Sequence, residues 1–334
     1  MLALQFELRS ELEATVPPEA RGVPRDGVAM LVSDRATNVH RSVLFSDLPE
    51  LLRAGDLLVV NDSQTLPAAL PARFGGVSFS LHLSAHIAGH LWTVEPRTDS
   101  ALQPATVTLP GEGRAELLAQ TDEKHRRLWY ARMDLPVSAF EYLQRYGKPI
   151  RYSYVRADWP LEMYQTIFAR KPGSAEMPSA ARPFTLRTLN RLARRNISIV
   201  PITLHCGVAS AERHEPPAAE WMDISPATAA RINAAADGGN RTIAVGTSVV
   251  RALESAADRH ERVTAFTGWT EHIVDGNYRP LAADGLLTGF HEPCASHLAL
   301  LEAFCRPTFL RVAYSAAIGA RMLWHEFGDV HLIL

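Results

Sequence analysis

The sequence predicts an α/β fold into which a small antiparallel β domain is inserted. Short apolar runs alternate with amphipathic helical segments before about residue 65 and after about residue 150, a pattern typical of α/β proteins. Between these limits the pattern changes to short β-like runs separated by Gly, Pro and polar turns. The two patterns therefore predict a main domain, built from both parts of the chain, and one inserted domain.

The first part of the main domain begins with a polar, proline-bearing segment over residues 1–25, which we expect to form an extended arm. Val28–Val32 predicts a strand, Ser46–Leu52 a short capped helix, and Asp56–Val60 a buried strand. Directly after this last strand comes the polar group Asn61-Asp62-Ser63. Asn and Asp side chains bond readily to nearby backbone, so this group predicts either a simple turn or part of a site.

The inserted region shows four β-like runs before any helical period appears at Val137–Tyr146. The runs are Ser78–Leu83, His90–Val94, Ala105–Leu109 and Leu128–Met133. The histidines of this region match no common zinc signature, and no cysteine accompanies them. We therefore expect no metal site here.

A polar loop, a helix start and a strand end follow one another between residues 164 and 207. An amphipathic segment, Tyr164–Phe168, leads into a loop punctuated by proline and glycine. Thr185 is the predicted N-cap of the helix that follows. The buried strand Ile197–Leu204 then delivers His205 and Gly207 at its carboxyl end, where α/β folds commonly bind ligands.

The remainder of the chain alternates between helices and strands. Ser225 caps a predicted helix that has Pro226 in its first turn and ends near Asp237. The later predicted strands are Thr242–Val245, Leu286–Phe290 and Val330–Leu334, and the later predicted helices run from Thr247 to about Asp258, from Ser296 to Phe304 and from Thr308 to Trp324.

Four predicted strands end in polar groups, and these would face one crevice if the strands are parallel. The groups are Asn61-Asp62, His205-Cys206-Gly207, Gly246-Thr247-Ser248 and Phe290-His291. The third group starts a helix, where free backbone N–H groups attract anions, although it also fits a simple N-cap. Arg251, one turn further, could contribute to the site or form a solvated ion pair with Glu254. His205 and His291 could transfer protons near neutral pH, or could be structural.

The composition excludes several classes of protein. Apolar residues make up 47% and charged residues 21% of the 334 residues, as in soluble globular proteins, and the formal net charge is −2. The total charge thus indicates neither nucleic acid nor membrane, but it leaves a local basic patch possible. The three cysteines, Cys206, Cys294 and Cys305, show no CxxC spacing, and no signal peptide or apolar run of membrane-spanning length is present. We expect a cytoplasmic protein.

The ordered motifs of the chain resemble the S-adenosylmethionine:tRNA ribosyltransferase-isomerase family of queuosine biosynthesis, over nearly the whole length. The motifs are FSDLPELLRAGDLLVVNDS near residue 50, YQTIFARKPGS from 164, PITLHCG from 201, RINAAADGGNRTIAVGTSVVRALES from 231, GWTEHIV from 268, DGLLTGFHEP from 284 and the final FGDVHLIL. The resemblance implies a barrel-like α/β catalytic domain over 1–65 and 150–334, with a β-barrel domain inserted at 66–149.

The resemblance also implies an unusual reaction. S-adenosylmethionine gives its ribosyl carbons to the aminomethyl group of a 7-deazaguanine base in tRNA, and adenine and methionine are released. A base must remove the proton next to the sulfonium, an acid should assist adenine, and polar groups must hold the ribose and the methionine. The reaction requires S-adenosylmethionine as a co-substrate and no metal.

Carried onto this chain, the family roles give His205 as the first candidate for acid/base work and His291 as the second. Thr247 and Ser248 at the helix start would hold the methionine carboxylate or the ribose. The other implied substrate-binding residues are Asn61, Asp62, Tyr164, Gln165, Thr166, Thr203, Gly207, Gly246, Arg251 and Phe290.

The sequence departs from the family pattern at several positions that carry a positive charge or a histidine in the family. Pro183 stands in place of a histidine, Cys294 in place of a lysine, and Gln64, Ala69 and Ala29 in place of arginines. Cationic side chains hold phosphates and supply much of the affinity for RNA. We expect a transferase-isomerase with the 7-deazaguanine of tRNA as its acceptor. The alternatives are the same chemistry on a free nucleobase or small amine, and a catalytically silent relative that binds S-adenosylmethionine or a nucleoside.

Overall fold

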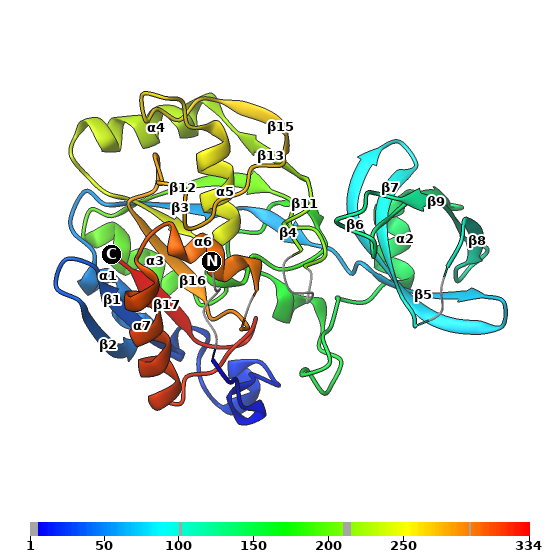
Figure 1. Ribbon diagram of the computed structural model, residues 1–334, viewed down its shortest axis with the longest axis horizontal. Helices are drawn as coiled ribbons and strands as arrows, with labels where there is room; N and C mark the ends of the chain where they lie inside the picture. Colours follow the sequence, from blue (N-terminus) through cyan, green and yellow to red (C-terminus); the bar gives the residue numbers. More distant parts are fainter. Residues whose placement is uncertain (1–5, 100–101, 210–214, 294) are drawn as a thin grey trace.

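The computed structural model describes residues 6–99, 102–209, 215–293 and 295–334. Figure 1 shows a large α/β body and a smaller barrel beside it, joined by the chain that leaves the body after β4 and returns after α2. This arrangement confirms the predicted fold class, an α/β protein with an inserted antiparallel β-barrel. None of the described helices is both long and apolar enough to cross a membrane.

Four parallel strands form the centre of the main sheet. They lie in the order β12 (Ser198–Leu204), β3 (Leu57–Asn61), β14 (Thr242–Val245) and β16 (Gly285–Gly289). Every residue of β3 is buried, because helices cover both faces of the sheet. The four strands are parallel, as the prediction of a common crevice requires.

Five further strands extend this sheet on its two sides. On one side lie β17 (Val330–Ile333), β1 (Ala29–Asp34) and β2 (Val39–Leu44), and on the other lie β13 (Glu220–Ile224) and β15 (Phe266–Thr270). The sheet thus has nine strands, with β15 and β2 at its edges.

Alternate side chains of β3 enter two separate cores. Leu57 and Val59 pack in the core beneath the later helices, whereas Leu58 and Val60 pack in the core beneath the earlier ones. The later helices are α4 (Pro226–Asp237), α5 (Thr247–Ala256), α6 (Ser296–Glu302) and α7 (Pro307–Gly319). The earlier helices are α1 (Leu48–Leu51) and α3 (Leu186–Arg194), with the 3₁₀ turns Phe45–Asp47 and Ser179–Ala181.

The inserted barrel closes through six antiparallel strands in the order β10-β7-β6-β5-β8-β9. They are β5 (Ala69–Phe74), β6 (Val77–Ala88), β7 (Leu91–Arg97), β8 (Ala105–Thr108), β9 (Arg114–Gln120) and β10 (Trp129–Asp134), followed by α2 (Ala139–Tyr146). Leu81, Val94 and Leu117 point into its apolar interior. The exact domain limits of 66 and 149 stay a prediction.

The sequence did not reveal several elements. The strands β2, β5, β9, β13 and β15 were missed, as was the small parallel pair of β4 (Ser63–Thr65) and β11 (Lys171–Ser174). The predicted arm is not simply extended over its described residues, because it contains the 3₁₀ turns Ser10–Leu12 and Pro18–Arg21, followed by Arg25–Gly27. Residues 1–5 lie outside the described residues. A further 3₁₀ turn, Leu161–Tyr164, stands where the amphipathic segment was predicted to begin.

Arg127 of the barrel joins the two bodies through buried contacts. Its guanidinium donates to both carboxylate oxygens of Glu215 at 3.0 Å, to Glu95 at 3.1 Å and to the Val208 carbonyl at 2.9 Å. The hydroxyl of Ser84, on β6, accepts from the Val208 backbone N–H at 3.0 Å. The barrel therefore holds the segment that follows the carboxyl end of β12.

Candidate active site

A pocket of about 960 Å³ lies at the carboxyl ends of β12, β14 and β16, between the main sheet and the barrel. Its volume is at the upper end of the range for small-molecule sites. Seven residues expected at the site line it: Tyr164, Gly207, Gly246, Thr247, Ser248, Arg251 and His291. The other seven, which are Asn61, Asp62, Gln165, Thr166, Thr203, His205 and Phe290, are not among its lining residues.

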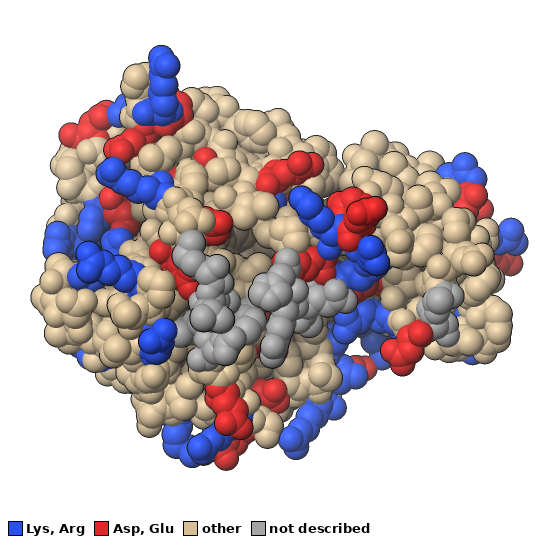
Figure 2. Space-filling model, viewed as in Figure 1, with Lys and Arg blue, Asp and Glu red and all other residues tan. Residues whose placement is uncertain are grey.

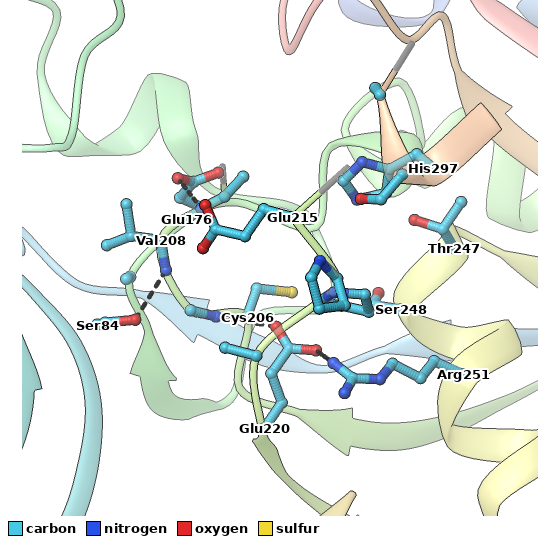
Figure 3. Close-up of a pocket in the computed structure, with 18 of the residues that line it drawn as sticks. Ser84, Glu176, Cys206, Val208, Glu215, Glu220, Thr247, Ser248, Arg251 and His297 are labelled. Atoms are coloured by element: carbon cyan, nitrogen blue, oxygen red, sulfur yellow. Dashed lines mark hydrogen bonds and ion pairs between the residues drawn. The ribbon is translucent and has the colours of Figure 1, made fainter. Parts of the chain in front are cut away.

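The start of α5 provides the pocket with an anion-attracting helix end. Gly246 has φ +104°, a conformation that favours glycine, and its backbone N–H donates to the Leu287 carbonyl at 2.8 Å. This turn directs the first residues of α5, Thr247 and Ser248, into the pocket (Figure 3). The first N–H groups of a helix have no partner within the helix and lie at the positive end of its dipole. The site can therefore hold a carboxylate or the hydroxyls of a sugar.

Arg251 fastens the pocket wall together from within α5. Its guanidinium pairs with Glu220 at 2.7 Å and donates to the backbone carbonyls of Thr270 and His272 at 3.1 and 2.9 Å. The other oxygen of Glu220 accepts from the Gly207 backbone N–H at 3.0 Å (Figure 3). Burial raises the pKa of Glu220, and the pairing with Arg251 opposes that shift. Arg251 thus positions the wall, because its guanidinium bonds among the described residues hold other parts of that wall together.

Cys206 lies in the pocket wall but is poorly suited to act as a nucleophile. Burial, with the nearby Glu220 and Glu176 carboxyls, raises the pKa of its thiol well above the usual range. The residue is held by its backbone N–H, which donates to Ser174 Oγ at 2.9 Å. A thiol with a raised pKa carries little thiolate at neutral pH.

His205 lies behind the pocket wall in a tightly packed setting. Its Nδ1 is 2.7 Å from Ser63 Oγ, which is itself 2.7 Å from Ser174 Oγ. The imidazole stacks on Trp221 with centroids 5.1 Å apart, and a side chain at Gly173 would collide with the ring. Burial lowers the pKa of His205 to about 4, so the ring is neutral at pH 7 and is a weak base.

Asn61, Asp62 and Thr203 lie in the floor, where they fix the ends of β3 and β12. The Asn61 amide donates to the Leu204 carbonyl at 2.7 Å and accepts from the Leu204 N–H at 3.0 Å. Thr203 donates its hydroxyl to Asp62 at 2.6 Å. Asn61 is fully buried, and its Oδ1 also accepts from the Ser63 backbone N–H at 3.0 Å, the local bond expected of a turn.

Tyr164, Gln165 and Thr166, which we call the YQT motif, have different environments. Tyr164 is buried and lines the pocket, and burial raises the pKa of its hydroxyl. The Gln165 amide forms two bonds with the Thr65 backbone, at 3.1 and 2.7 Å, while the Thr166 hydroxyl accepts from the Phe168 N–H. Only the first residue of this motif reaches the pocket wall.

His291 enters the pocket after β16, whereas Phe290 points away from it. Phe290 packs against Trp324 with ring centroids 4.7 Å apart. The imidazole of His291 is 2.9 Å from the Thr288 hydroxyl and stacks on His297 at 4.7 Å. Burial, reinforced by the neighbouring histidines, lowers the pKa of His291 well below its usual value. A neutral imidazole in the wall can form hydrogen bonds with a ligand, and its lowered pKa makes it a weaker base than a free histidine.

Sequence reasoning missed a group of pocket residues from four separate segments: Tyr152, Tyr154, Glu176, Glu215, His325 and Glu326. Glu176 follows the YQT motif within the polar loop, but no spacing rule distinguishes it from a surface glutamate. The two tyrosines lie outside any regular element, so no periodic pattern signals their burial.

Comparisons with known proteins extend over the whole chain. A model for a family described as queuosine biosynthesis protein matches residues 1–333. The S-adenosylmethionine:tRNA ribosyltransferase-isomerase of Symbiobacterium thermophilum is 34% identical over 340 residues, which cover 98% of both chains. The protein of the same name from Thermosynechococcus vestitus is 34% identical over 347 residues, covering 99% of this chain and 95% of the relative.

A similar arrangement occurs in a solved structure, the S-adenosylmethionine tRNA ribosyltransferase of Thermotoga maritima. The two structures align with a TM-score of 0.57 and 26% sequence identity, and the alignment covers 98% of this chain and 99% of the other. The similarity therefore includes both the main sheet and the inserted barrel.

Proposed function

Because the chain belongs to the queuosine biosynthesis protein family, we propose that it is an S-adenosylmethionine:tRNA ribosyltransferase-isomerase. It transfers the ribosyl part of S-adenosylmethionine to the aminomethyl group of a 7-deazaguanine base in tRNA and releases adenine and methionine. No specific observation favours a free nucleobase as acceptor or a silent protein.

The observation that best supports this proposal is the pairing of an anion-attracting helix end with a carboxylate-rich wall in one pocket. The N-terminus of α5, with Thr247 and Ser248, suits the methionine carboxylate or the ribose hydroxyls. Glu176, Glu215 and Glu220 line the pocket as well. Glu215 and Glu220 are paired with Arg127 and Arg251, so it is the Glu176 carboxylate whose negative charge suits the sulfonium or amine cation of the substrates.

Binding of tRNA would use the surface around this pocket. Figure 2 shows Lys and Arg side chains gathered along the junction between the barrel and the main body, next to Asp and Glu side chains. Phosphate contacts from cationic side chains make binding weaken as salt increases. We therefore propose that tRNA lies across this junction, and that its affinity falls steeply between low and moderate salt.

Adenine release from S-adenosylmethionine is the direct test of the proposed reaction. The expected result is release that requires tRNA carrying 7-aminomethyl-7-deazaguanine, with none when unmodified tRNA replaces it. Supplying the free base in place of tRNA is the matched control. Release with the free base alone would assign the protein to a small-molecule acceptor, and binding of S-adenosylmethionine without release would indicate a silent relative.

His291 and His205 are the two candidates for the proton transfer, and their alanine variants are expected to show which of them performs it. His291 lines the pocket and His205 does not, so we expect His291→Ala to lower kcat by about 10²-fold or more, the usual contribution of a general acid or base. His205→Ala should lower kcat less. Single-turnover adenine release at saturating substrate measures both. A larger loss of kcat for His205→Ala would assign the proton transfer to His205. Unchanged turnover in both variants would show that neither histidine transfers the proton.

A further inference from the structure

Two glutamates and two tyrosines form a hydrogen-bonded group in the pocket wall, to which no proton transfer has been assigned above. The Tyr152 hydroxyl donates to Glu176 Oε1, and the Ala209 backbone N–H donates to the same oxygen at 2.8 Å. The Tyr154 hydroxyl donates to Glu326 Oε2 at 2.6 Å, and the two tyrosine rings stack with centroids 5.8 Å apart. Both carboxyls line the pocket.

One oxygen of Glu176 is held by the protein while the other is available to a ligand. Oε1 accepts both hydrogen bonds that the described residues make to this carboxyl, and none of them goes to Oε2. Figure 3 shows Glu176 on the side of the pocket nearer the barrel, with Thr247 and Ser248 on the α5 side. A substrate held at α5 would therefore meet Glu176 from across the pocket.

The surroundings of Glu176 allow its carboxyl to gain and lose a proton near neutral pH. Burial raises the pKa of Glu176 to about 7, the Tyr152 and Ala209 donors oppose this shift, and the Glu326 and Glu95 carboxyls add to it. The nearest groups of other elements are engaged elsewhere or neutral. Arg127 pairs with Glu95 and Glu215, and His325, which stacks on Tyr154, has its pKa lowered to about 4 by burial.

We propose that Glu176 is a catalytic base that removes a proton from the primary ammonium group of the acceptor. This rests on the proposed function, which supplies an aminomethyl acceptor. A primary ammonium has no lone pair and cannot attack carbon. Glu176 Oε2 takes one N–H proton, the electron pair of that bond stays on nitrogen, and the products are a neutral amine and a neutral carboxylic acid. The carboxylate also attracts the ammonium before the transfer.

Tyr152 acts as a positioning residue in this proposal. Its hydroxyl fixes Oε1 and leaves Oε2 directed at the ligand, and its hydrogen bond lowers the pKa of Glu176. Because Glu176 must be ionised to act as a base, kcat/KM should rise as the pH increases through its pKa. Tyr152→Phe should move this rise to higher pH, while Glu176 itself remains. A structural role alone would lower activity without moving that rise.

The decisive variant is Glu176→Gln, which keeps an oxygen for the two donors but cannot take a proton. With S-adenosylmethionine and tRNA carrying the modified base, kcat is expected to fall by about 10²-fold or more, with the KM for S-adenosylmethionine changed less than about twofold. The rise of kcat/KM near pH 7 should disappear. Glu116 is exposed on the outside of the barrel, so Glu116→Gln is the matched control. This control should leave kcat and the pH dependence of kcat/KM unchanged.

A stability measurement tests the ionisation of Glu176 without any substrate. A carboxyl whose folded-state pKa is raised, from 4.5 to about 7, contributes stability that is complete below the unfolded pKa and is lost as pH rises through the folded pKa. The melting temperature of the wild type should thus fall relative to that of Glu176→Gln between about pH 5 and pH 8. A constant difference across this range would overturn the proposal.

The kinetic outcomes separate this inference from the proposed function. If the wild type releases adenine with modified tRNA and Glu176→Gln matches it in rate and pH profile, the role of Glu176 is wrong and the proposed function stands. If the wild type releases no adenine with any amine acceptor, both are wrong. A loss of turnover confined to Glu176→Gln, with the pH rise abolished, supports both.

Discussion

Replacing Arg251 with methionine is expected to lower the free energy of unfolding by about 3–5 kcal/mol, the usual cost of leaving one partner of a buried ion pair without its counter-charge. The Arg251 and Glu220 side chains are only 5% and 17% exposed. Methionine fills a similar volume but donates no hydrogen bond, so Glu220 Oε2 and the carbonyls of Thr270 and His272 lose the Arg251 donor together. Urea denaturation measures the loss.

Two companion variants test the cause of that loss. Arg262 forms an ion pair with Asp237 that is exposed on both sides, so Arg262→Met should leave stability almost unchanged. Adding Glu220→Gln to Arg251→Met removes the stranded charge and should recover part of the stability. If Arg251→Met is as stable as Arg262→Met, the buried pair does not fasten the pocket wall as described.

Replacing Ser248 with aspartate is expected to weaken S-adenosylmethionine binding by about 10²-fold or more while α5 stays folded. A carboxylate in the first turn stabilises a helix through its dipole. The same carboxylate repels a second one in the proposed methionine site by several kcal/mol at about 4 Å in a partly buried setting. Isothermal titration calorimetry with S-adenosylmethionine measures the affinity, and thermal melting measures the fold.

Ser225→Asp is the matched control for this prediction, because Ser225 caps α4 and is not among the residues that line the pocket. Aspartate is as good an N-cap as serine, so both stability and affinity should be retained. If Ser248→Asp binds S-adenosylmethionine as well as the wild type does, the helix start of α5 is only a cap and the methionine carboxylate lies elsewhere.

The central fold could be predicted from the sequence because its strands are fully buried. Apolar runs such as those of β3 and β14 are continuous, and each is followed at once by a polar group. The strands β13 and β15 were missed because they lie toward the edge of the sheet, where only some of their side chains are buried. Their residues therefore show no apolar run.

The candidate site could be predicted in part, for a related reason. The strand ends and the start of α5 follow directly from the order of elements, so Gly246 and Thr247 were placed in the right region. Asn61 and Asp62 occupy the same edge of the sheet, but their side chains bond to the neighbouring strand beneath the pocket. Glu176 and Tyr152 meet only after folding, because they lie on separate irregular segments.

The order of strands in the main sheet has a consequence for how the chain reaches its native state. The neighbours of β3 in the sheet arrive late, since Leu57 pairs with Ser198 and with Thr242. Likewise Met30 of β1 pairs with Val330. The barrel, by contrast, uses only strands that follow closely along the chain. During synthesis the barrel can therefore close first, while β3 stays unpaired and β1 is paired only with β2 until distant segments emerge. Contacts of such high sequence separation make the main sheet the slow step of folding.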